Sequence, residues 1–306
     1  MDVGVIGLGR MGGNMAARLL DAGHRVVAHD PSAEAVASVE AKGGVPAVAI
    51  AELIGLLRPP RAVWVMVPAG DATEQVVIEL GERLEAGDAV IDGGNSNYRE
   101  TLRRAEQLRG KGIHLVDVGT SGGVWGLSEG YCLMIGGEES VVERHRPLFE
   151  ALAPAADAGW ARVGPTGAGH FVKMVHNGIE YGLMQAYAEG FAILRAKDAF
   201  DLDLARISRL WESGSVIRSW LLELTSRALA EDPDLQGLAA YVEDSGEGRW
   251  TVQEAIDLDV PAPVITHALI QRLRSRTERS FADRLLAGLR RQFGGHAVRP
   301  PENGPA

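Results

Sequence analysis

One stretch of the chain gathers side chains that could exchange protons with a substrate. These are Lys173, His176, Asn177, Glu180 and Tyr181. At roughly 100° per residue along an α-helix, the five side chains fall within an arc of about 140°. An uncharged lysine can act as a base and a protonated glutamate as an acid. The pattern therefore predicts a catalytic face on one helix.

The spacing along this helix separates the two groups that could carry protons. Lys173 and Glu180 are two turns apart, about 10 Å along the axis, so a base and an acid can reach different carbons of an extended substrate. The alternative is a solvated face on which Lys173 pairs with Asn177 or Glu180. Glycines flank the face at positions 167, 169, 178 and 182. Each costs about 1 kcal/mol relative to alanine in a helix, which indicates close packing or ligand approach and favours catalysis.

The N-terminal residues Gly7-Leu8-Gly9-Arg10-Met11-Gly12 fit the G-x-G-x-x-G pattern. The pattern follows a predicted strand and opens a predicted helix, which is the context of a dinucleotide site. Gly7 would form the tight turn, Gly9 would let a pyrophosphate approach the backbone, and Gly12 would let the helix pack on the strand. The helix N-terminus would offer its N–H groups to the phosphates. The alternative is a glycine-rich turn without a ligand.

Asp30 ends the second predicted strand, 30 − 12 = 18 residues after the motif. A carboxylate there accepts hydrogen bonds from the adenine ribose and repels a 2′-phosphate. Pro31 and Ser32 follow without an arginine, so NAD is favoured over NADP. The alternative is that Asp30 only caps the next helix, which Ser32 could also do.

Two polar turns follow later strands and could hold a substrate. Asp92-Gly93-Gly94-Asn95-Ser96 lies at the carboxyl end of a predicted strand, where open α/β sheets bind ligands. Thr120-Ser121-Gly122-Gly123 offers hydroxyls and backbone N–H groups suited to a carboxylate. Each could equally be only a turn.

Short apolar runs alternate with helical stretches in the first half of the chain. Strands are predicted at 3–6, 25–29, 62–67, 89–92, 113–118 and 133–135, and helices at 11–22 and 32–42. This alternation predicts βαβ units and a parallel sheet. Helices alone are predicted after residue 166, at 169–197, 204–211, 216–230, 251–258, 263–276 and 280–293. The predicted fold is an α/β Rossmann-like N-terminal domain, 1–165, followed by an all-α C-terminal domain, 166–306.

The composition limits the classes of function. The chain has 306 residues, 46% of them apolar and 24% charged, as in ordinary globular proteins. Its net charge of −10 disfavours nucleic-acid binding, although a few arginines can still hold an anionic small molecule. No uninterrupted apolar stretch predicts a membrane helix.

The single cysteine, Cys132, lies in an apolar run typical of a buried strand. It can form no intrachain disulfide, and no cluster of metal ligands predicts a metal site. The first residues lack the pattern of a signal peptide, so we expect a cytoplasmic protein.

Seven blocks of sequence carry a resemblance to a known family. They are Gly7-x-Gly9-x-x-Gly12, Val67-Pro68-Ala69-Gly70, Ile91-Asp92-Gly93-Gly94-Asn95-Ser96, Ser121-Gly122-Gly123, the residues 169–181, Gly248-Arg249-Trp250-Thr251 and the residues 290–296. Together they resemble decarboxylating 6-phosphogluconate dehydrogenase, nearly end to end, and block 169–181 is the most specific. At 306 residues the chain is similar to the short, NAD-type branch of that family in the β-hydroxyacid dehydrogenase superfamily.

The resemblance implies oxidation and decarboxylation of 6-phosphogluconate to ribulose 5-phosphate and CO2, with reduction of NAD. Uncharged Lys173 would take the proton of the C3 hydroxyl while hydride passes to NAD. The 3-keto acid would then lose CO2, and the ammonium of Lys173 would stabilise the enediol. Glu180 would protonate C1 of the enediol, which gives ribulose 5-phosphate, and His176 and Asn177 complete the implied catalytic set.

The resemblance also implies binding residues. The predicted cofactor contacts are Gly7, Leu8, Gly9, Arg10, Met11, Gly12, Asp30, Val67, Pro68, Ala69 and Asn95. The predicted substrate contacts are Asn95, Ser121, Gly122, Gly123, His176, Asn177, Tyr181, Arg272, Arg290 and His296. In the family, the last two come from a neighbouring subunit. A homodimer or homotetramer is therefore implied, with the C-terminal tail reaching a neighbouring active site.

The chain departs from the long branch at one phosphate-binding position. The long branch has a lysine there, and this chain has Ser245, which offers a weaker contact to a phosphate. The rival enzyme is another β-hydroxyacid dehydrogenase, such as one that oxidises 3-hydroxyisobutyrate. That enzyme would need neither His176, nor Glu180 with Tyr181, nor the 290–296 tail. A non-catalytic dinucleotide sensor is a third possibility, but it predicts loss of Lys173 or Glu180, and both are present.

Overall fold

The computed structural model describes residues 1–277 and 280–294. Contacts divide the chain into two compact units. The first unit comprises Met1–Ile179 together with Glu247–Leu258, and the second comprises Glu180–Gly246 with the described residues from Asp259 onward. The domains predicted from the sequence, 1–165 and 166–306, follow the change from alternating strands and helices to helices alone, whereas the two units follow contacts. The division into these two domains stays a prediction.

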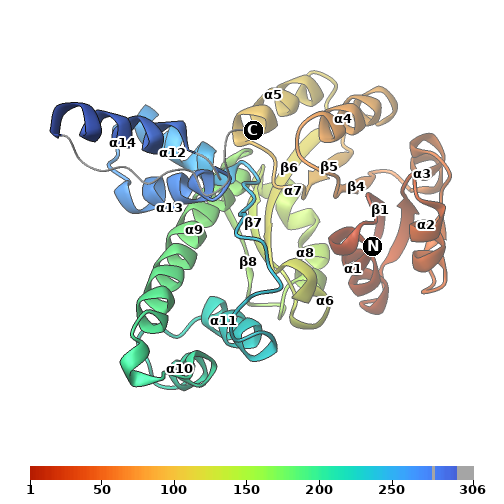
Figure 1. The fold of residues 1–306 in the computed structure, drawn as a ribbon. Helices are drawn as coiled ribbons and strands as arrows, with labels where there is room; N and C mark the ends of the chain where they lie inside the picture. Colours follow the sequence, from red (N-terminus) through yellow and green to blue (C-terminus); the bar gives the residue numbers. More distant parts are fainter. Residues whose placement is uncertain (278–279, 295–306) are drawn as a thin grey trace. The chain divides into compact units, whose positions relative to one another are not determined.

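The first unit is built on an eight-stranded sheet with the order β3-β2-β1-β4-β5-β6-β7-β8 (Figure 1). The strands are β1 (Asp2–Ile6), β2 (Arg25–His29), β3 (Val45–Pro46), β4 (Ala62–Val65), β5 (Ala89–Asp92), β6 (His114–Ser121), β7 (Cys132–Gly136) and β8 (Trp160–Gly164). The chain turns back across the sheet between β1 and β4, which is the point where such sheets bind ligands. The Rossmann-like α/β class predicted from the sequence is confirmed.

The sequence predicts a parallel sheet, but one pair of neighbouring strands in this sheet is antiparallel. Strand β7 runs antiparallel to β6, with Ser121 opposite Cys132, while the other neighbouring strands pair in parallel. Only residues 122–131 join these two strands, which is short for the crossover that a parallel pair requires. Cys132 is exposed at the start of β7, so the prediction of a buried cysteine is wrong although its strand exists.

Helices cover both faces of the sheet (Figure 1). They are α1 (Arg10–Asp21), α2 (Ala33–Glu40), α3 (Ile50–Leu56), α4 (Asp71–Arg83), α5 (Tyr98–Arg109), η1 (Gly123–Trp125), α6 (Gly126–Glu129), α7 (Glu139–Arg144) and α8 (Arg146–Leu152). Helices α1 and α8 pack on one face around Trp64, and α3, α4 and α5 pack on the other around Val63. Side chains alternate between faces along each strand, so both faces of these strands are buried.

The described part of the second unit is helical. Its elements include the end of α9 (Ala168–Arg195), η2 (Asp198–Phe200), α10 (Leu204–Trp211), α11 (Trp220–Glu231), α13 (Pro263–Arg274) and α14 (Phe281–Gly294). The helix α12 (Glu247–Asp257) belongs to the first unit. A small core of Phe191, Leu222 and Leu229 joins α9 to α11. Helix α11 begins later than predicted because Ser219 caps it, accepting a hydrogen bond from Leu222 N.

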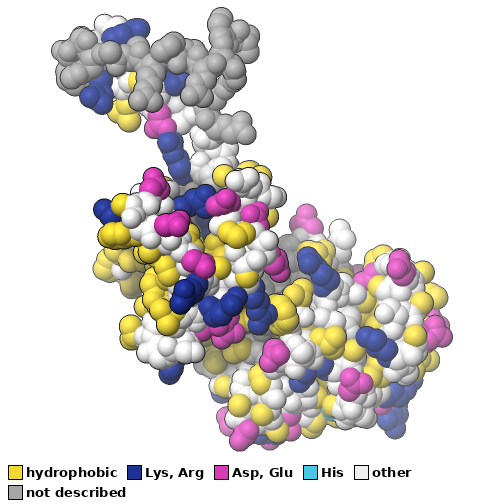
Figure 2. All heavy atoms as spheres, turned by 60° about the horizontal axis from the view of Figure 1, so that its bottom comes forward, with side chains coloured by type: hydrophobic (Ala, Val, Ile, Leu, Met, Phe, Trp, Pro, Cys, Tyr) yellow, Lys and Arg dark blue, Asp and Glu magenta, His cyan; other side chains and the backbone are white. Residues whose placement is uncertain are grey.

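Charged side chains of both signs are interspersed over the face drawn in Figure 2. In the described part of the chain, no helix combines the length and the apolar character needed to cross a membrane.

Candidate active site

The glycine motif forms a tight loop between β1 and α1. Gly7 has φ +89°, and a Cβ on it would lie 2.4 Å from the carbonyl oxygen of Met66. A Cβ on Gly12 would lie 1.9 Å from the carbonyl oxygen of Gly7. At Gly9, the N-cap of α1, a Cβ would meet no atom within 4 Å. Thus two glycines are required by packing, and the third leaves open space for a phosphate group above the helix N-terminus.

Asp30 lies beside this loop at the end of β2. Its Oδ2 accepts a hydrogen bond from Leu8 N at 2.7 Å, and its Oδ1 accepts one from Ser32 N at 2.8 Å. Ser32, rather than Asp30, is the N-cap of α2 and accepts from Ala35 N. Each carboxylate oxygen has a further lone pair, so Asp30 can still accept from a ribose hydroxyl.

A cavity of about 360 Å³ opens next to Asp30, between the glycine loop and α2. Its wall includes Gly9, Arg10, Ser32 and Lys42. Pro68 and Ala69 are exposed in the loop that follows β4, on the other side of the turning point of the sheet. The residues present therefore fit a dinucleotide.

Asn95 joins the two polar turns that the sequence singled out. Its Nδ2 donates to the carbonyl of Thr120 at 3.1 Å, and its Oδ1 accepts from Thr120 N at 2.8 Å. Asn95 adopts φ +54°, and Asp92 holds the same turn by accepting from Gly94 N and Ser96 Oγ. The turn that carries Ser121, Gly122 and Gly123 is thereby fixed beside β5.

Asp117 anchors the N-terminus of α9 and was missed in the sequence. It is fully buried in β6, where it accepts hydrogen bonds from Gly167 N at 2.6 Å and His170 N at 2.9 Å. A carboxylate at a helix N-terminus satisfies free N–H groups and complements the helix dipole. The signal that could have found it is an aspartate inside the apolar run of residues 115–118.

The glycines near the predicted catalytic face serve close packing. A Cβ on Gly169 would lie 2.4 Å from the carbonyl oxygen of Met134 and 2.5 Å from that of Asp117. A Cβ on Gly119 in β6 would lie 2.4 Å from Cβ of Lys173. Gly178 packs in the same way against Thr251 of α12. The helix therefore lies directly on the sheet at the level of Lys173.

Lys173, His176 and Asn177 come together on α9 as predicted. Lys173 is buried, with 5% of its surface exposed, and its Nζ donates to Asn177 Oδ1 at 2.6 Å. His176 Nδ1 lies 3.4 Å from Lys173 Nζ and 3.1 Å from Asn177 Oδ1. Asn177 thus fixes the direction of the amine.

Tyr181 continues the polar face of α9 in the second unit. Its ring is buried under Arg272, whose Cζ lies 3.4 Å from the ring centroid. Its hydroxyl lies 3.4 Å from Ser245 Oγ. A guanidinium and two hydroxyls in one place suit an oxyanion.

The remaining predicted residues are placed as follows. Glu180 is half-buried on α9, within the second unit, and Arg290 is exposed on α14. His296 lies outside the described residues. Their predicted roles stay predictions, as do the roles of the other site residues.

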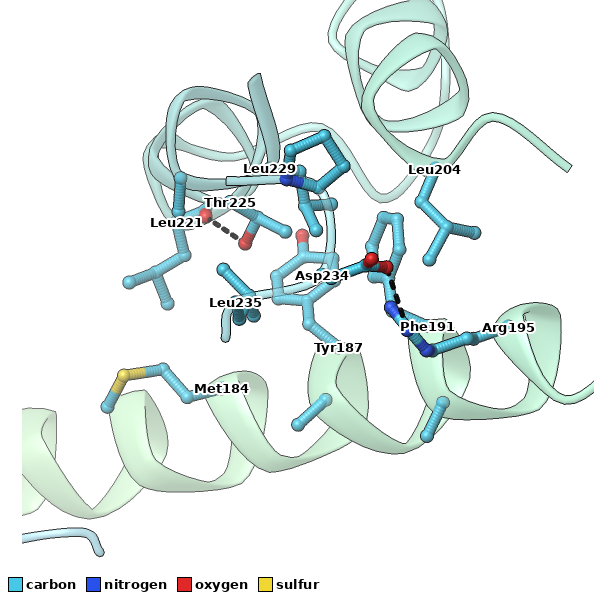
Figure 3. A pocket seen from close by; sticks show the side chains of 14 residues that line it. Met184, Tyr187, Phe191, Arg195, Leu204, Leu221, Thr225, Leu229, Asp234 and Leu235 are labelled. Carbon is cyan, nitrogen blue, oxygen red and sulfur yellow. Dashed lines mark hydrogen bonds and ion pairs between the residues drawn. The ribbon is translucent and has the colours of Figure 1, made fainter. Parts of the chain in front are cut away.

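A larger cavity of about 570 Å³ lies in the second unit, and none of the predicted site residues lines it. Tyr187 and Phe191 of α9 point into it, facing Leu221 and Leu229 of α11 (Figure 3). An ion pair between Arg195 and Asp234, 2.7 Å long, lies at its edge. Its wall is mainly apolar, which is unlike a site for a sugar acid.

Two family models match the chain. Residues 2–162 match the NAD binding domain of 6-phosphogluconate dehydrogenase, and residues 169–295 match the C-terminal domain of 6-phosphogluconate dehydrogenase. Among relatives, the NAD(+)-dependent, decarboxylating 6-phosphogluconate dehydrogenase of Haloferax volcanii is 46% identical over 299 residues, covering 97% of this chain and 98% of the relative.

A second relative and a solved structure extend this likeness. The NADP(+)-dependent, decarboxylating 6-phosphogluconate dehydrogenase of Bacillus subtilis is 37% identical over 302 residues, covering 94% of this chain and 64% of the relative. The structure of Plasmodium falciparum 6-phosphogluconate dehydrogenase aligns with a TM-score of 0.83 at 27% identity, covering 99% of this chain and 67% of that one.

Proposed function

Since the chain belongs to the 6-phosphogluconate dehydrogenase family, we propose that it converts 6-phosphogluconate to ribulose 5-phosphate and CO2 with reduction of NAD. The observation that carries the proposal is the buried Lys173 amine, oriented by Asn177 and adjoining His176 on the helix that also bears Glu180. The 3-hydroxyisobutyrate alternative is disfavoured, because it leaves the polar cluster of Tyr181, Arg272 and Ser245 without a purpose.

Lys173 and Glu180 then each have one proton to move. A bound nicotinamide ring supplies the acceptor for the hydride from C3. Lys173 takes the proton of the C3 hydroxyl as the C3 ketone forms. The ketone lies β to the carboxylate, so the C1–C2 bond breaks to release CO2 and its electrons pass into an enediol. The ammonium of Lys173 stabilises the charge that develops on the C3 oxygen. Glu180 then delivers a proton to the former C2, which becomes C1 of the pentulose phosphate.

The contacts of the substrate are proposed from the same arrangement. The turn of Ser121, Gly122 and Gly123, fixed by Asn95, would hold the carboxylate end. Tyr181, Arg272 and Ser245 would hold the phosphate end, together with Arg290 and His296 of a neighbouring subunit.

The preference for NAD is proposed from Asp30. Its carboxylate lies at the loop where the adenine ribose would bind, and a 2′-phosphate there would meet its negative charge. The chain is similar both to an NAD(+)-dependent and to an NADP(+)-dependent relative, so the proposal rests on Asp30.

We also propose that the protein is a homo-oligomer. Helix α14 exposes a stripe of Phe281, Leu285, Leu286 and Leu289, between 50% and 71% exposed. Helix α14 carries three arginines and one aspartate, whereas four aspartates, Arg195 and Lys197 line the hollow next to the apolar cavity. The apolar stripe, which matches the apolar cavity, and this complementarity of charge support a second copy of the chain as the occupant of the cavity. Sedimentation velocity should show a dimer or tetramer, and Leu289→Glu should shift it toward the monomer.

A spectrophotometric assay tests the proposed function. The protein should reduce NAD with 6-phosphogluconate and release CO2, with kcat/KM about tenfold higher for NAD than for NADP, equivalent to ~1.4 kcal/mol. Asp30→Ala should reduce that preference. Activity with 3-hydroxyisobutyrate and none with 6-phosphogluconate would contradict the proposal, and equal use of both cofactors would show that Asp30 does not contact the ribose.

A further inference from the structure

Residues 241–246 of the second unit, called the strap below, are held along their backbone by the last turn of α13 and by the two residues that follow the helix. Ser275 Oγ accepts a hydrogen bond from Val242 N at 3.0 Å. Arg276 donates from Nε and Nη2 to the carbonyl of Val242, at 3.1 and 3.0 Å. Arg272 donates from Nη1 to the carbonyl of Glu243 at 2.8 Å. Three side chains thus fix two successive residues of the strap.

The strap leads directly to the polar cluster around Tyr181. Ser245 is exposed, and its Oγ lies 3.4 Å from the hydroxyl of Tyr181. Arg272 stacks on the Tyr181 ring, and its bond to Glu243 uses one of the five N–H donors of the guanidinium. The position of the Ser245 hydroxyl relative to these two groups therefore depends on how the strap is held.

The strap itself carries charge that opposes anion binding. Glu243 and Asp244 immediately precede Ser245. Asp244 turns its Oδ1 back to Gly246 N, at 3.1 Å. Arg276 Nη2 lies 3.8 Å from Glu243 Oε2, and the arginine side chain is only 24% exposed while that of Glu243 is 82% exposed. Arg276 is thus a fixed cation that offsets the negative charge next to the hydroxyl.

We propose that Arg276 is a positioning residue for an oxyanion site formed by Ser245, Tyr181 and Arg272. Arg276 holds the strap so that the Ser245 hydroxyl faces the other two groups, and it offsets the charge of Glu243. The proposal deepens the proposed function, and rests on it, in taking the anion to be the phosphate of the substrate. Because Arg276 binds the backbone of the strap, its loss changes affinity for the phosphate end and not the chemistry at C1 to C3.

Steady-state kinetics of Arg276→Met test this proposal. We expect KM for 6-phosphogluconate to rise about tenfold, as for loss of a charge-assisted hydrogen bond, with kcat changed less than twofold. Arg276→Lys should recover part of the affinity. The matched control is Arg274→Met, which removes the same charge two residues earlier, from the last residue of α13, where Arg274 pairs with Asp283. This control should leave both KM and kcat unchanged.

A second measurement separates this proposal from the proposed function. Inorganic phosphate should raise the thermal unfolding midpoint of the wild-type protein and of Arg274→Met, and much less that of Arg276→Met. If the wild type binds phosphate in this way but does not oxidise 6-phosphogluconate, the proposed function fails and the oxyanion site stands. If Arg276→Met retains the wild-type KM and the wild-type response to phosphate, or lowers kcat at unchanged KM, Arg276 does not position this site.

Discussion

The two ends of helix α9 differ in what surrounds them. Residues 168–179 belong to the first unit, where Asp117 binds the helix N-terminus and Gly169 lies against the backbone of two strands. Residues 180–195 belong to the second unit, where a Cβ on Gly190 would meet no atom within 4 Å. The proposed base, Lys173, is in the first part, and the proposed acid, Glu180, is in the second.

This difference indicates which part of the protein holds the residue that acts in each of the two proposed steps, oxidation and protonation. The amine of Lys173 is placed by a sheet whose core tolerates little change in volume. Glu180 and the oxyanion cluster belong to the unit with a small core and much exposed apolar surface. We therefore expect oxidation to depend on the packing of the first unit, and the later protonation to depend on the second unit.

The largest expected effect is the loss of the base. Lys173→Met should lower the rate of NADH formation by about 10²–10⁴-fold, the contribution that general base catalysis typically makes. The matched control is Lys197→Met, which removes a lysine whose amine lies over the Phe200 ring in the second unit. Retention of a tenth or more of the activity by Lys173→Met would show that another group accepts the proton.

The same substitution at two glycines of α9 should have opposite effects on stability. Gly169→Ala places a methyl group 2.4 Å from the carbonyl oxygen of Met134 and 2.5 Å from that of Asp117, and should destabilise the protein by about 3 kcal/mol. Gly190→Ala meets open space and should stabilise it by up to about 1 kcal/mol. Thermal or urea unfolding measures both, and a stabilising Gly169→Ala would contradict the close packing of α9 on the sheet.

A smaller effect is expected on the dependence of folding stability on pH, and it comes from His145, a buried histidine of the first unit. Burial lowers the pKa of His145 to about 4, although Val141 accepts a hydrogen bond from its Nδ1. The unfolded chain binds this proton near pH 6.5, so His145 contributes stability above pH 6.5 that is lost as pH falls toward 4. Between pH 6.5 and 5 the loss should be up to about 2 kcal/mol.

The variant His145→Gln isolates this contribution. Its unfolding free energy should fall less than that of the wild type between pH 7 and pH 5. Parallel pH profiles for the two proteins would show that His145 is protonated equally in the folded and unfolded chain.

Periodicity predicted most of the fold because most elements are buried on a regular pattern. Strands β2 and β5 and helix α10 have the predicted bounds. Strand β3 has only two residues, and most of β8 is exposed at the edge of the sheet, so neither leaves an apolar run. The direction of β7 depends on the length of its connection, which an apolar pattern does not encode.

Contacts in the candidate site could be predicted where both residues lie on one helix. They were harder to predict where the fold brings together residues from distant segments of the chain. The contacts among Lys173, His176 and Asn177 follow from helical spacing. The pairing of Asn95 with the backbone of Thr120, and the binding of Asp117 to the start of α9, join segments that lie far apart in the chain. Arg276 could not have been singled out, because its partner is a backbone carbonyl, which any residue provides.

A single-turnover experiment on Glu180→Gln tests the division of work along α9 most directly. NADH and pentulose phosphate would be followed separately after mixing the variant with 6-phosphogluconate and NAD. The account predicts that NADH forms in the first turnover while the pentulose lags, because Glu180 acts only after oxidation. If Glu180→Gln loses NADH formation to the same extent as Lys173→Met, then Glu180 positions the substrate or the lysine, and the two ends of the helix do not serve separate steps.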